Sequence, residues 1–521
     1  MIADNRQIQQ LLALLLGHGI TDVVVCPGSR NAPLVHSLGQ VKGFACHPVT
    51  DERSAGFVAL GMAQATHRPV AVCVTSGSAL VNLHPAVTEA YYQQIPLIVI
   101  SADRPKAWIG QMDGQTMPQE GVFGKMVRMS VSLPEIHTDT DEWHCNRLIN
   151  EALLECRHHV DGPVHINVPV SEPLYEFHTE ALPKVRRIKR VDGRRREAME
   201  QLFEKMNEKC LIIIGQNAHS IDGNTLPTIH EYAAILGESL SNLHLPNIVV
   251  GNLDTICKHI IDKHDERFTP EVVITLGGHV VSKQLKLFLR SVKPQQHWHV
   301  DAEGKVVDLF QCLTHVVEMK TTDFIEELAN YIRREGLYSV YPEMWENEMR
   351  MKRNGTLSEV EEVVGELIAN LPEDSVVHLA NSSAVRYAQK MPFHRTIRVC
   401  CNRGINGIEG SMSTAVGYAM ACPQKENYLI IGDLSFFYDQ NALWNTHLPA
   451  NLHILLLNSG GGRIFDTLPV PNDKETREMV CALHHTSARH ACEQYGITYL
   501  TDVCIETFIH TQGPTLLEIQ Q

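Results

Sequence analysis

Polar residues that could bind a metal ion and a phosphate follow two apolar segments in the last third of the chain. Gly432-Asp433-Leu434-Ser435 comes directly after one segment, and Asn458-Ser459-Gly460-Gly461-Gly462 comes after the next. Carboxylate, amide, hydroxyl and backbone carbonyl oxygens suit Mg²⁺, and glycines let backbone N–H groups approach phosphate oxygens. The pair indicates a diphosphate and metal site, although such turns also close many α/β units without any ligand.

A second acidic motif lies near the N-terminus, where Asp51 and Glu52 precede the small-residue segment 53–61. A carboxylate at the start of a helix is often only a favourable interaction with the helix dipole. Taken alone, this motif favours that structural role, and its meaning depends on the other motifs.

Apolar, β-branched runs alternate with helical patterns through most of the chain. Such runs predict parallel sheets covered by helices on both faces. In these sheets, sites form at the carboxyl ends of the strands, where the polar motifs fall. The expected strands are Val23–Cys26, Val70–Thr75, Pro96–Ser101, Val164–Val168, Cys210–Gly215, Glu271–Gly278, His297–Asp301, Ser375–Ala380, Tyr428–Asp433, His453–Asn458 and Thr515–Gln520.

The length of 521 residues suggests three domains. We expect domains at 1–182, 195–335 and 356–521. The basic run Lys184–Arg196 would be a solvated linker, and the polar stretch Gly336–Gly355 a second one.

Composition excludes several classes of protein. The net charge of −15 argues against a nucleic-acid binder. The fourteen cysteines form no CxxC pair, so they indicate reduced core residues. No HExxH motif supports a histidine metal site. No apolar segment is long enough to span a membrane, and residues 1–20 look like an amphipathic helix, so we expect a cytoplasmic protein without a membrane partner.

In combination, Glu52, the segment Thr75–Leu83 and the two motifs of the last domain resemble the thiamine-diphosphate-dependent decarboxylase family. The resemblance implies the α/β fold of that family, with three consecutive parallel-sheet domains. These would be a pyrimidine-binding domain, a central domain and a diphosphate-binding domain. It also implies thiamine diphosphate with Mg²⁺ or Mn²⁺, and a homodimer or homotetramer with its active sites at the subunit interface. Glu52 would hydrogen-bond the aminopyrimidine and promote the imino form that deprotonates the thiazolium carbon.

Finer matches are similar to one branch of this family, which decarboxylates 2-oxoglutarate and adds the succinyl carbanion to isochorismate in menaquinone biosynthesis. They include Cys26–Leu34, Ser101–Pro105, Asn381–Arg386 and Asn402–Gly410. Both substrates carry two carboxylates, which guanidinium groups bind in a two-point fashion.

By this resemblance, the residues expected to act in catalysis are Glu52, Arg30, Gln115, Ser382, Arg386 and Arg403. Those expected to contact substrate are Arg30, Arg104, Gln115, Lys283, Arg386 and Arg403. Those expected at the cofactor are Ser29, Glu52, Thr75, Ser382, Ile408, Gly432, Asp433, Leu434, Ser435, Gly461, Gly462, Ile464 and Phe465. Those expected at the metal are Asp433, Ser459 and Gly461.

The chain departs from the family pattern at two positions. Ser459 stands where an asparagine is frequent, so its hydroxyl or a water would complete the metal site. Gln284 stands where an arginine is often found beside the lysine. Two alternatives stay open: another thiamine-diphosphate enzyme, such as a relative of acetolactate synthase or a simple decarboxylase, and a non-catalytic diphosphate-binding regulator. The arginines disfavour the first, and the presence of Glu52 disfavours the second.

Overall fold

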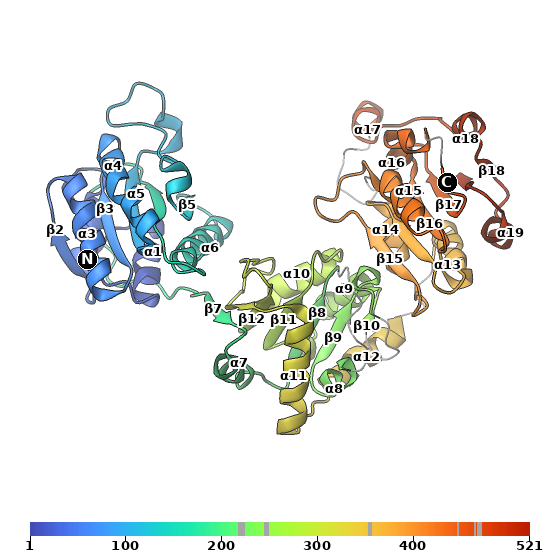
Figure 1. Ribbon diagram of the computed structural model, residues 1–521, viewed down its shortest axis with the longest axis horizontal. Helices are drawn as coiled ribbons and strands as arrows, with labels where there is room; N and C mark the ends of the chain where they lie inside the picture. Colours follow the sequence, from blue (N-terminus) through green and yellow to red (C-terminus); the bar gives the residue numbers. More distant parts are fainter. Residues whose placement is uncertain are drawn as a thin grey trace. The chain divides into compact units, whose positions relative to one another are not determined.

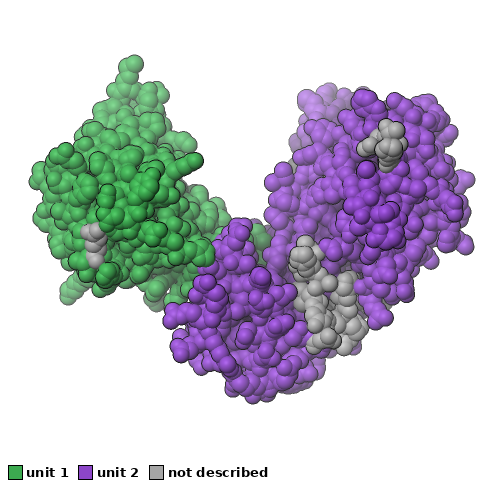
Figure 2. All heavy atoms as spheres, in the orientation of Figure 1, with its two compact units in different colours: residues 1–190, 306–316 green, residues 191–305, 317–521 purple. Residues whose placement is uncertain are grey.

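The computed structural model describes residues 1–216, 225–243, 249–352, 357–444, 448–462, 465, 471 and 473–520. Figure 1 shows the helices and strands, and Figure 2 shows the two compact units into which the chain divides. Unit 1 comprises residues 1–190 and 306–316, and unit 2 comprises residues 191–305 and 317–521. The described residues form three sheets, of six, seven and six strands. The α/β architecture with three parallel sheets is therefore confirmed.

The first sheet lies in unit 1 and has the strand order β2-β1-β3-β4-β6-β5, with every pair parallel. Its strands are β1 (Asp22–Val25), β2 (Ala45–Pro48), β3 (Val70–Val74), β4 (Leu97–Asp103), β5 (Met129–Ser132) and β6 (Val164–Pro169). Its helices are α1 (Arg6–Gly17), α2 (Ala32–Gln40), α3 (Glu52–Thr66), α4 (Ser78–Asn82), α5 (His84–Gln93) and α6 (Asp139–Glu155).

Both faces of this sheet are buried, which explains why its strands read as continuous apolar runs. Along β3, Ala71 and Cys73 belong to an apolar cluster with α1, α2 and α6, whereas Val72 and Val74 belong to a second cluster with α3 and α5. The expected amphipathic helix near the N-terminus is α1, whose Leu11 is fully buried. No helix among the described residues is both long and apolar enough to cross a membrane.

The middle sheet has the order β10-β9-β8-β11-β12-β13-β7, and the pairs from β10 to β12 are parallel. Its strands are β7 (Lys189–Asp192), β8 (Cys210–Ile214), β9 (Ala234–Gly237), β10 (Val249–Val250), β11 (Val272–Leu276), β12 (Gln296–Val300) and β13 (His315–Glu318). Its helices are α7 (Arg196–Phe203), α8 (Leu226–His230), α9 (Leu253–Lys263), α10 (Lys283–Val292), α11 (Thr321–Glu335) and α12 (Tyr341–Lys352).

Both stretches expected to be linkers contain regular structure. The basic run includes β7, and its Arg186 forms an ion pair of 2.7 Å with the fully buried carboxylate of Asp308. The second stretch folds as α12, because Tyr341 and Trp345 supply large apolar surfaces that become buried. The interpretation of these segments as solvated linkers is therefore wrong for the parts that form β7 and α12.

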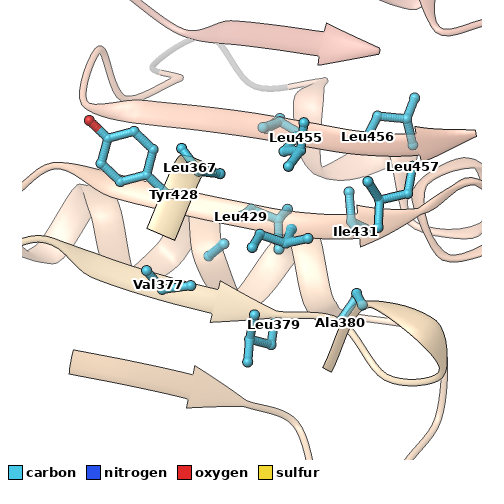
Figure 3. Close-up of a cluster of buried hydrophobic side chains, with 14 of the residues drawn as sticks. Leu367, Val377, Leu379, Ala380, Tyr428, Leu429, Ile431, Leu455, Leu456 and Leu457 are labelled. Carbon is cyan, nitrogen blue, oxygen red and sulfur yellow. The ribbon is translucent and has the colours of Figure 1, made fainter. Parts of the chain in front are cut away.

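The third sheet has the order β15-β14-β16-β17-β19-β18, again all parallel. Its strands are β14 (Val376–Leu379), β15 (Arg398–Cys401), β16 (Asn427–Gly432), β17 (Leu452–Asn458), β18 (Thr498–Leu500) and β19 (Thr515–Gln520). Its helices are α13 (Glu359–Asn370), α14 (Ser383–Ala388), α15 (Ser411–Ala421), α16 (Asp433–Tyr438), α17 (Lys474–Val480), α18 (Arg489–Tyr495) and α19 (Ile505–His510). Figure 3 shows the packing of its central strands, with Leu379, Leu429 and Leu455 in one buried cluster.

The fourteen cysteines are all free thiols, and Cys504 alone is exposed. Burial raises the pKa of Cys73 and of Cys210 to about 12, so both thiols stay protonated in the apolar core. Nine of the fourteen are buried, so most cysteines lie in the core as expected.

Candidate active site

In unit 1, the expected site residues lie at the carboxyl ends of the first sheet. The turn after β1 passes so close to β3 that a Cβ atom on Gly28 would lie 2.4 Å from Cβ of Thr75. Asn31 holds this turn by donating from Nδ2 to the Cys26 carbonyl at 2.8 Å. The hydroxyl of Thr75 and Oδ1 of Asn31 are buried without a hydrogen-bond partner among the described residues. Such orphaned polar atoms are rare unless a ligand or water completes them.

Glu52 is the first residue of α3, and the helix is capped by the preceding Asp51, whose side chain accepts from the Ser54 amide at 3.0 Å. Capping is thus the role of Asp51, which leaves the half-buried Glu52 carboxylate available for chemistry. Its only hydrogen bond within the described part of the chain is a long one of 3.3 Å from Asn82. Burial, with the negative charge of Glu52 close by, raises the pKa of the Cys26 thiol to about 12.

Two of the expected arginines approach the same carboxylate in unit 1. Arg30 is almost fully buried and donates to the Val170 carbonyl at 2.9 Å and to Glu172 at 3.1 Å. Arg104 lies 3.8 Å from the same Glu172 oxygen and pairs with Asp113 at 3.0 Å. Their guanidinium groups are therefore held in fixed directions near each other.

Gln115 lies in an exposed loop that a buried glutamine attaches to the sheet. Gln119 donates from Nε2 to Oδ1 of Asn167 at 2.8 Å and to the Ala102 carbonyl at 3.0 Å. Its Oε1 accepts from the Gly77 amide at 2.7 Å. A Cβ on Gly77, whose φ is 78°, would lie 3.2 Å from the backbone of Gln115. Gln119 thus connects the loop of Gln115 to the turn after β3.

In unit 2, a cavity of about 200 Å³ lies at the carboxyl ends of the third sheet. Ten of the residues expected at the cofactor or the metal line it: Ser382, Ile408, Gly432, Asp433, Leu434, Ser435, Ser459, Gly461, Gly462 and Phe465. Ile464 lies outside the described residues. The parallel strands bring these residues together because β14, β16 and β17 are neighbours in register.

Oxygen atoms cluster at one end of this cavity, around the buried Asp433. Its Oδ2 accepts from the backbone amides of Ser459 and Gly461, both at 2.9 Å. The Ser459 hydroxyl lies 3.3 Å from the same carboxylate oxygen and 2.8 Å from the Gly461 carbonyl. Oxygens about 3 Å apart match neighbouring ligands of a six-coordinate ion with bonds of about 2.1 Å.

The turn after β17 has a shape that only glycine allows. Gly461 has a φ of 147°, and a Cβ there would lie 2.9 Å from the Cys481 carbonyl. Backbone groups therefore border the cavity directly. With the oxygen cluster, this turn fits a diphosphate and its metal ion.

Asn381 also lines the cavity and holds a neighbouring segment in place. Its Nδ2 donates to the carbonyls of Asn402 at 2.8 Å and Gly407 at 2.7 Å, and its Oδ1 accepts from Arg403 at 2.9 Å. Burial lowers the pKa of Arg403, although its guanidinium remains protonated at neutral pH. The next segment presents the partly exposed Ile408, whose carbonyl accepts from the hydroxyl of Ser435.

The remaining expected substrate residues of unit 2 are exposed. Arg386 of α14 has no ion-pair partner among the described residues, and it lines a cavity of about 330 Å³ together with Ser282 and Asp254 of the middle sheet. Lys283 begins α10 beside that cavity.

Two carboxylates hold the start of α10. Glu238 accepts from the amides of Val281 at 2.7 Å and Ser282 at 2.6 Å, and Asp254 accepts from the Ser282 hydroxyl at 2.7 Å and the Gln284 amide at 2.8 Å. Burial raises the pKa of Glu238, against the effect of these hydrogen bonds.

The expected residues thus form two groups. Ser29, Arg30, Glu52, Thr75, Arg104 and Gln115 belong to unit 1, and the others belong to unit 2. The motifs did not assign roles to Gln119, Asn381, Glu238 and Asp254, which position the groups just described. The feature that marks these residues is that they are polar and yet wholly or partly buried near a strand end. The sequence does not show whether a single polar residue is buried, so sequence patterns could not have identified them.

Residues 6–125 match the family model of the thiamine pyrophosphate enzyme N-terminal TPP binding domain. Together with the parallel sheets and the cavity around Asp433, this match defines the chain as a thiamine-diphosphate-dependent enzyme.

Curated proteins similar to this chain include several named 2-succinyl-5-enolpyruvyl-6-hydroxy-3-cyclohexene-1-carboxylate synthase. The synthases of Phocaeicola vulgatus and Bacteroides thetaiotaomicron are each 51% identical to this chain, over 96% of it and 91% of their own length. That of Flavobacterium johnsoniae is 39% identical over 94% of this chain and 90% of its own length. The chain belongs to this family of synthases.

Proposed function

We propose that this enzyme decarboxylates 2-oxoglutarate and joins the resulting four-carbon succinyl unit to isochorismate, as a step of menaquinone biosynthesis. The bond between the carboxylate and the 2-oxo carbon breaks, a carbon–carbon bond to isochorismate forms, and one proton is taken up for each CO₂ released. The family membership supports this reaction. The single observation that carries it in the structure is the cavity in which ten expected residues meet.

In this proposal, the cavity of unit 2 binds the diphosphate end of thiamine diphosphate. Asp433, the Ser459 hydroxyl and the Gly461 carbonyl are the ligands for Mg²⁺ or Mn²⁺, because all three are oxygen donors grouped at one end of the cavity. Thiamine diphosphate supplies the electron sink that accepts the negative charge left when CO₂ departs. Ile408, whose carbonyl accepts from the Ser435 hydroxyl, would contact the cofactor from the wall of the cavity.

Glu52 is the proton-handling residue of the proposal. Because Asp51 caps α3, the Glu52 carboxylate is free to accept a hydrogen bond from a pyrimidine nitrogen. Ser29 and the hydroxyl of Thr75, which has no hydrogen-bond partner among the described residues, lie on the same edge of the sheet and supply further polar contacts.

The arginines are the proposed contacts for substrate carboxylates. Arg386 and Arg403 act from unit 2, together with Ser382 at the start of α14 and Lys283 at the start of α10. Arg30, Arg104 and Gln115 act from unit 1. A guanidinium group that is already oriented loses little entropy when it binds a carboxylate through two hydrogen bonds.

We further propose a homodimer or a homotetramer in the cytoplasm, with the active sites at the subunit interface. Residues 1–182 would form the pyrimidine-binding domain, 195–335 the central domain and 356–521 the diphosphate-binding domain. Analytical ultracentrifugation of the full chain with the cofactor tests the assembly, and a monomeric holoenzyme would contradict it.

An assay with carboxyl-labelled 2-oxoglutarate tests the reaction. With thiamine diphosphate and Mg²⁺, we expect rapid CO₂ release that requires isochorismate, and a product with the mass of the adduct. EDTA should stop the release, and Mg²⁺ or Mn²⁺ should restore it. Absence of turnover would reject the proposal, whereas CO₂ release from pyruvate without isochorismate would favour a relative of acetolactate synthase.

A further inference from the structure

His484 lies beside the carboxylate that we propose as the charged ligand of the metal ion. Its Nε2 is 3.3 Å from Oδ2 of Asp433, and both side chains are largely buried, with 17% and 5% of their surfaces exposed. The residue is 51 positions away from Asp433 in the sequence, in the loop before α18. We propose that His484 is a positioning residue that orients Asp433 toward the metal ion, an inference that rests on the proposed metal site.

The tautomer of His484 follows from its other ring nitrogen. The backbone amide of Thr486 donates to Nδ1 at 3.1 Å, so Nδ1 must present a lone pair and carries no proton. In a neutral imidazole the proton is then on Nε2, which faces Asp433. His484 therefore directs an N–H toward the carboxylate, although Nε2 is buried and makes no hydrogen bond among the described residues, and it has no lone pair on Nε2 with which to bind the metal itself.

The loop that carries His484 is fixed from two sides. The backbone N–H of His484 donates to the Gly460 carbonyl at 2.9 Å, which attaches the loop to the glycine turn after β17. Nδ2 of Asn458 donates to the Thr486 carbonyl at 2.8 Å, and the buried Glu518 accepts from the Ala488 amide at 3.1 Å. The imidazole is thus held near Asp433 by the hydrogen bonds of its own loop.

The position of this one carboxylate matters because the other two proposed ligands, the Ser459 hydroxyl and the Gly461 carbonyl, are uncharged. Among the proposed protein ligands, only Asp433 then carries a negative charge that attracts a divalent ion. A group that hydrogen-bonds a ligating carboxylate fixes its direction, and loss of such a partner typically weakens metal binding about 10- to 100-fold. The donor role of His484 also keeps the proposed first shell entirely oxygen, as Mg²⁺ and Mn²⁺ prefer.

Binding of Mn²⁺ to the full-length protein with thiamine diphosphate, followed by the electron paramagnetic resonance signal of the free ion, tests this role without any turnover. We expect His484→Ala to weaken Mn²⁺ binding by at least about 10-fold. His484→Gln, whose side-chain amide can still donate toward Asp433, should stay within a few-fold of the wild type. The neighbouring exposed His485 is the matched control, and His485→Ala should bind Mn²⁺ normally.

Two further readouts separate positioning from other roles. Pulsed resonance spectra of the bound Mn²⁺ should lack the coupling of a directly bonded nitrogen, and the metal-free melting temperature of His484→Gln should match that of the wild type. The proposal is overturned by normal Mn²⁺ binding in His484→Ala, by equal losses in the Ala and Gln variants, or by a directly bonded nitrogen. Since no substrate is present, these results are independent of the assay for the synthase reaction.

Discussion

Gln119 accepts a hydrogen bond from the backbone amide of Gly77 through its Oε1, at a distance of 2.7 Å. This bond joins the loop that contains Gln115 to the turn after β3, two segments that are separated in the chain by α4, α5 and β4. The same side chain donates to Asn167 and to the Ala102 carbonyl, so all of its polar atoms have partners in the buried interior.

Replacement of Gln119 by Leu should lower both stability and substrate affinity. The variant leaves the Gly77 amide and Oδ1 of Asn167 without this partner, and an unsatisfied buried group costs about 1–3 kcal/mol. We expect a lower melting temperature and a higher KM with a smaller change in kcat. The exposed neighbour provides the control, since Glu120→Ala should change none of these quantities. An unaltered melting temperature in Gln119→Leu would contradict the positioning role.

Glu52→Gln should abolish most of the activity and leave cofactor binding nearly intact. The amide keeps the size of the side chain but cannot accept a proton, and loss of a general acid–base group typically costs about 10²- to 10⁴-fold in rate. Steady-state CO₂ release gives the rate, and calorimetric titration with thiamine diphosphate gives the affinity. Glu89→Gln, on an exposed position of α5, is the control. Near-normal activity in Glu52→Gln would show that the proposed proton relay is wrong.

Arg403→Lys should raise KM for a dicarboxylate substrate about 10-fold, which corresponds to about 1.4 kcal/mol. Lysine keeps the positive charge, but it lacks the planar fork that lets Arg403 contact Asn381 and a substrate together. Initial rates at varied 2-oxoglutarate and isochorismate concentrations would show which substrate is affected. Arg395 is exposed, and Arg395→Lys should leave both KM values unchanged. A normal KM for both substrates in Arg403→Lys would remove this arginine from the proposed site.

The buried His378 should make the third sheet sensitive to acid. Burial lowers the pKa of His378 from 6.5 to about 4, although its hydrogen bond to Asn427 acts in the opposite direction. The unfolded chain therefore binds more protons than the folded chain between these two values. The contribution of the uncharged His378 to the free energy of unfolding is complete above pH 6.5. It is lost as the pH falls toward 4, by about 1.4 kcal/mol per pH unit.

Thermal unfolding at pH 7 and pH 5 measures this effect. His378→Gln removes the titrating group and should reduce the loss of melting temperature between the two pH values. His394→Gln, at an exposed position, should show the same loss as the wild type. Equal losses in His378→Gln and the wild type would contradict the assignment.

Much of the fold and of the cofactor site can be predicted from the sequence because the relevant signals are local. A strand buried on both faces needs a continuous apolar run, and β3, β16 and β17 were expected for that reason. Polar residues directly after such runs must lie at one edge of a parallel sheet. Asp433 and Ser459 were therefore expected together, and in the structure the Ser459 hydroxyl lies 3.3 Å from Oδ2 of Asp433.

Other features depend on partners that are distant in the sequence, and only the tertiary structure decided them. The polar segment that contains α12 reads as a linker until Tyr341 and Trp345 are seen to be buried. The role of Gln119 depends on Gly77, and that of His484 depends on both Thr486 and Asp433.

The sequence by itself thus determined the parallel sheets, the family and the chemical types of residue at the strand ends. Those properties follow from local patterning and from the fixed geometry of parallel strands. The tertiary structure decided which polar side chains hold the reactive groups in place. A buried hydrogen bond forms only when its donor and acceptor are placed to within a few tenths of an ångström. When the two groups lie in segments far apart in the chain, no local sequence pattern contains that information.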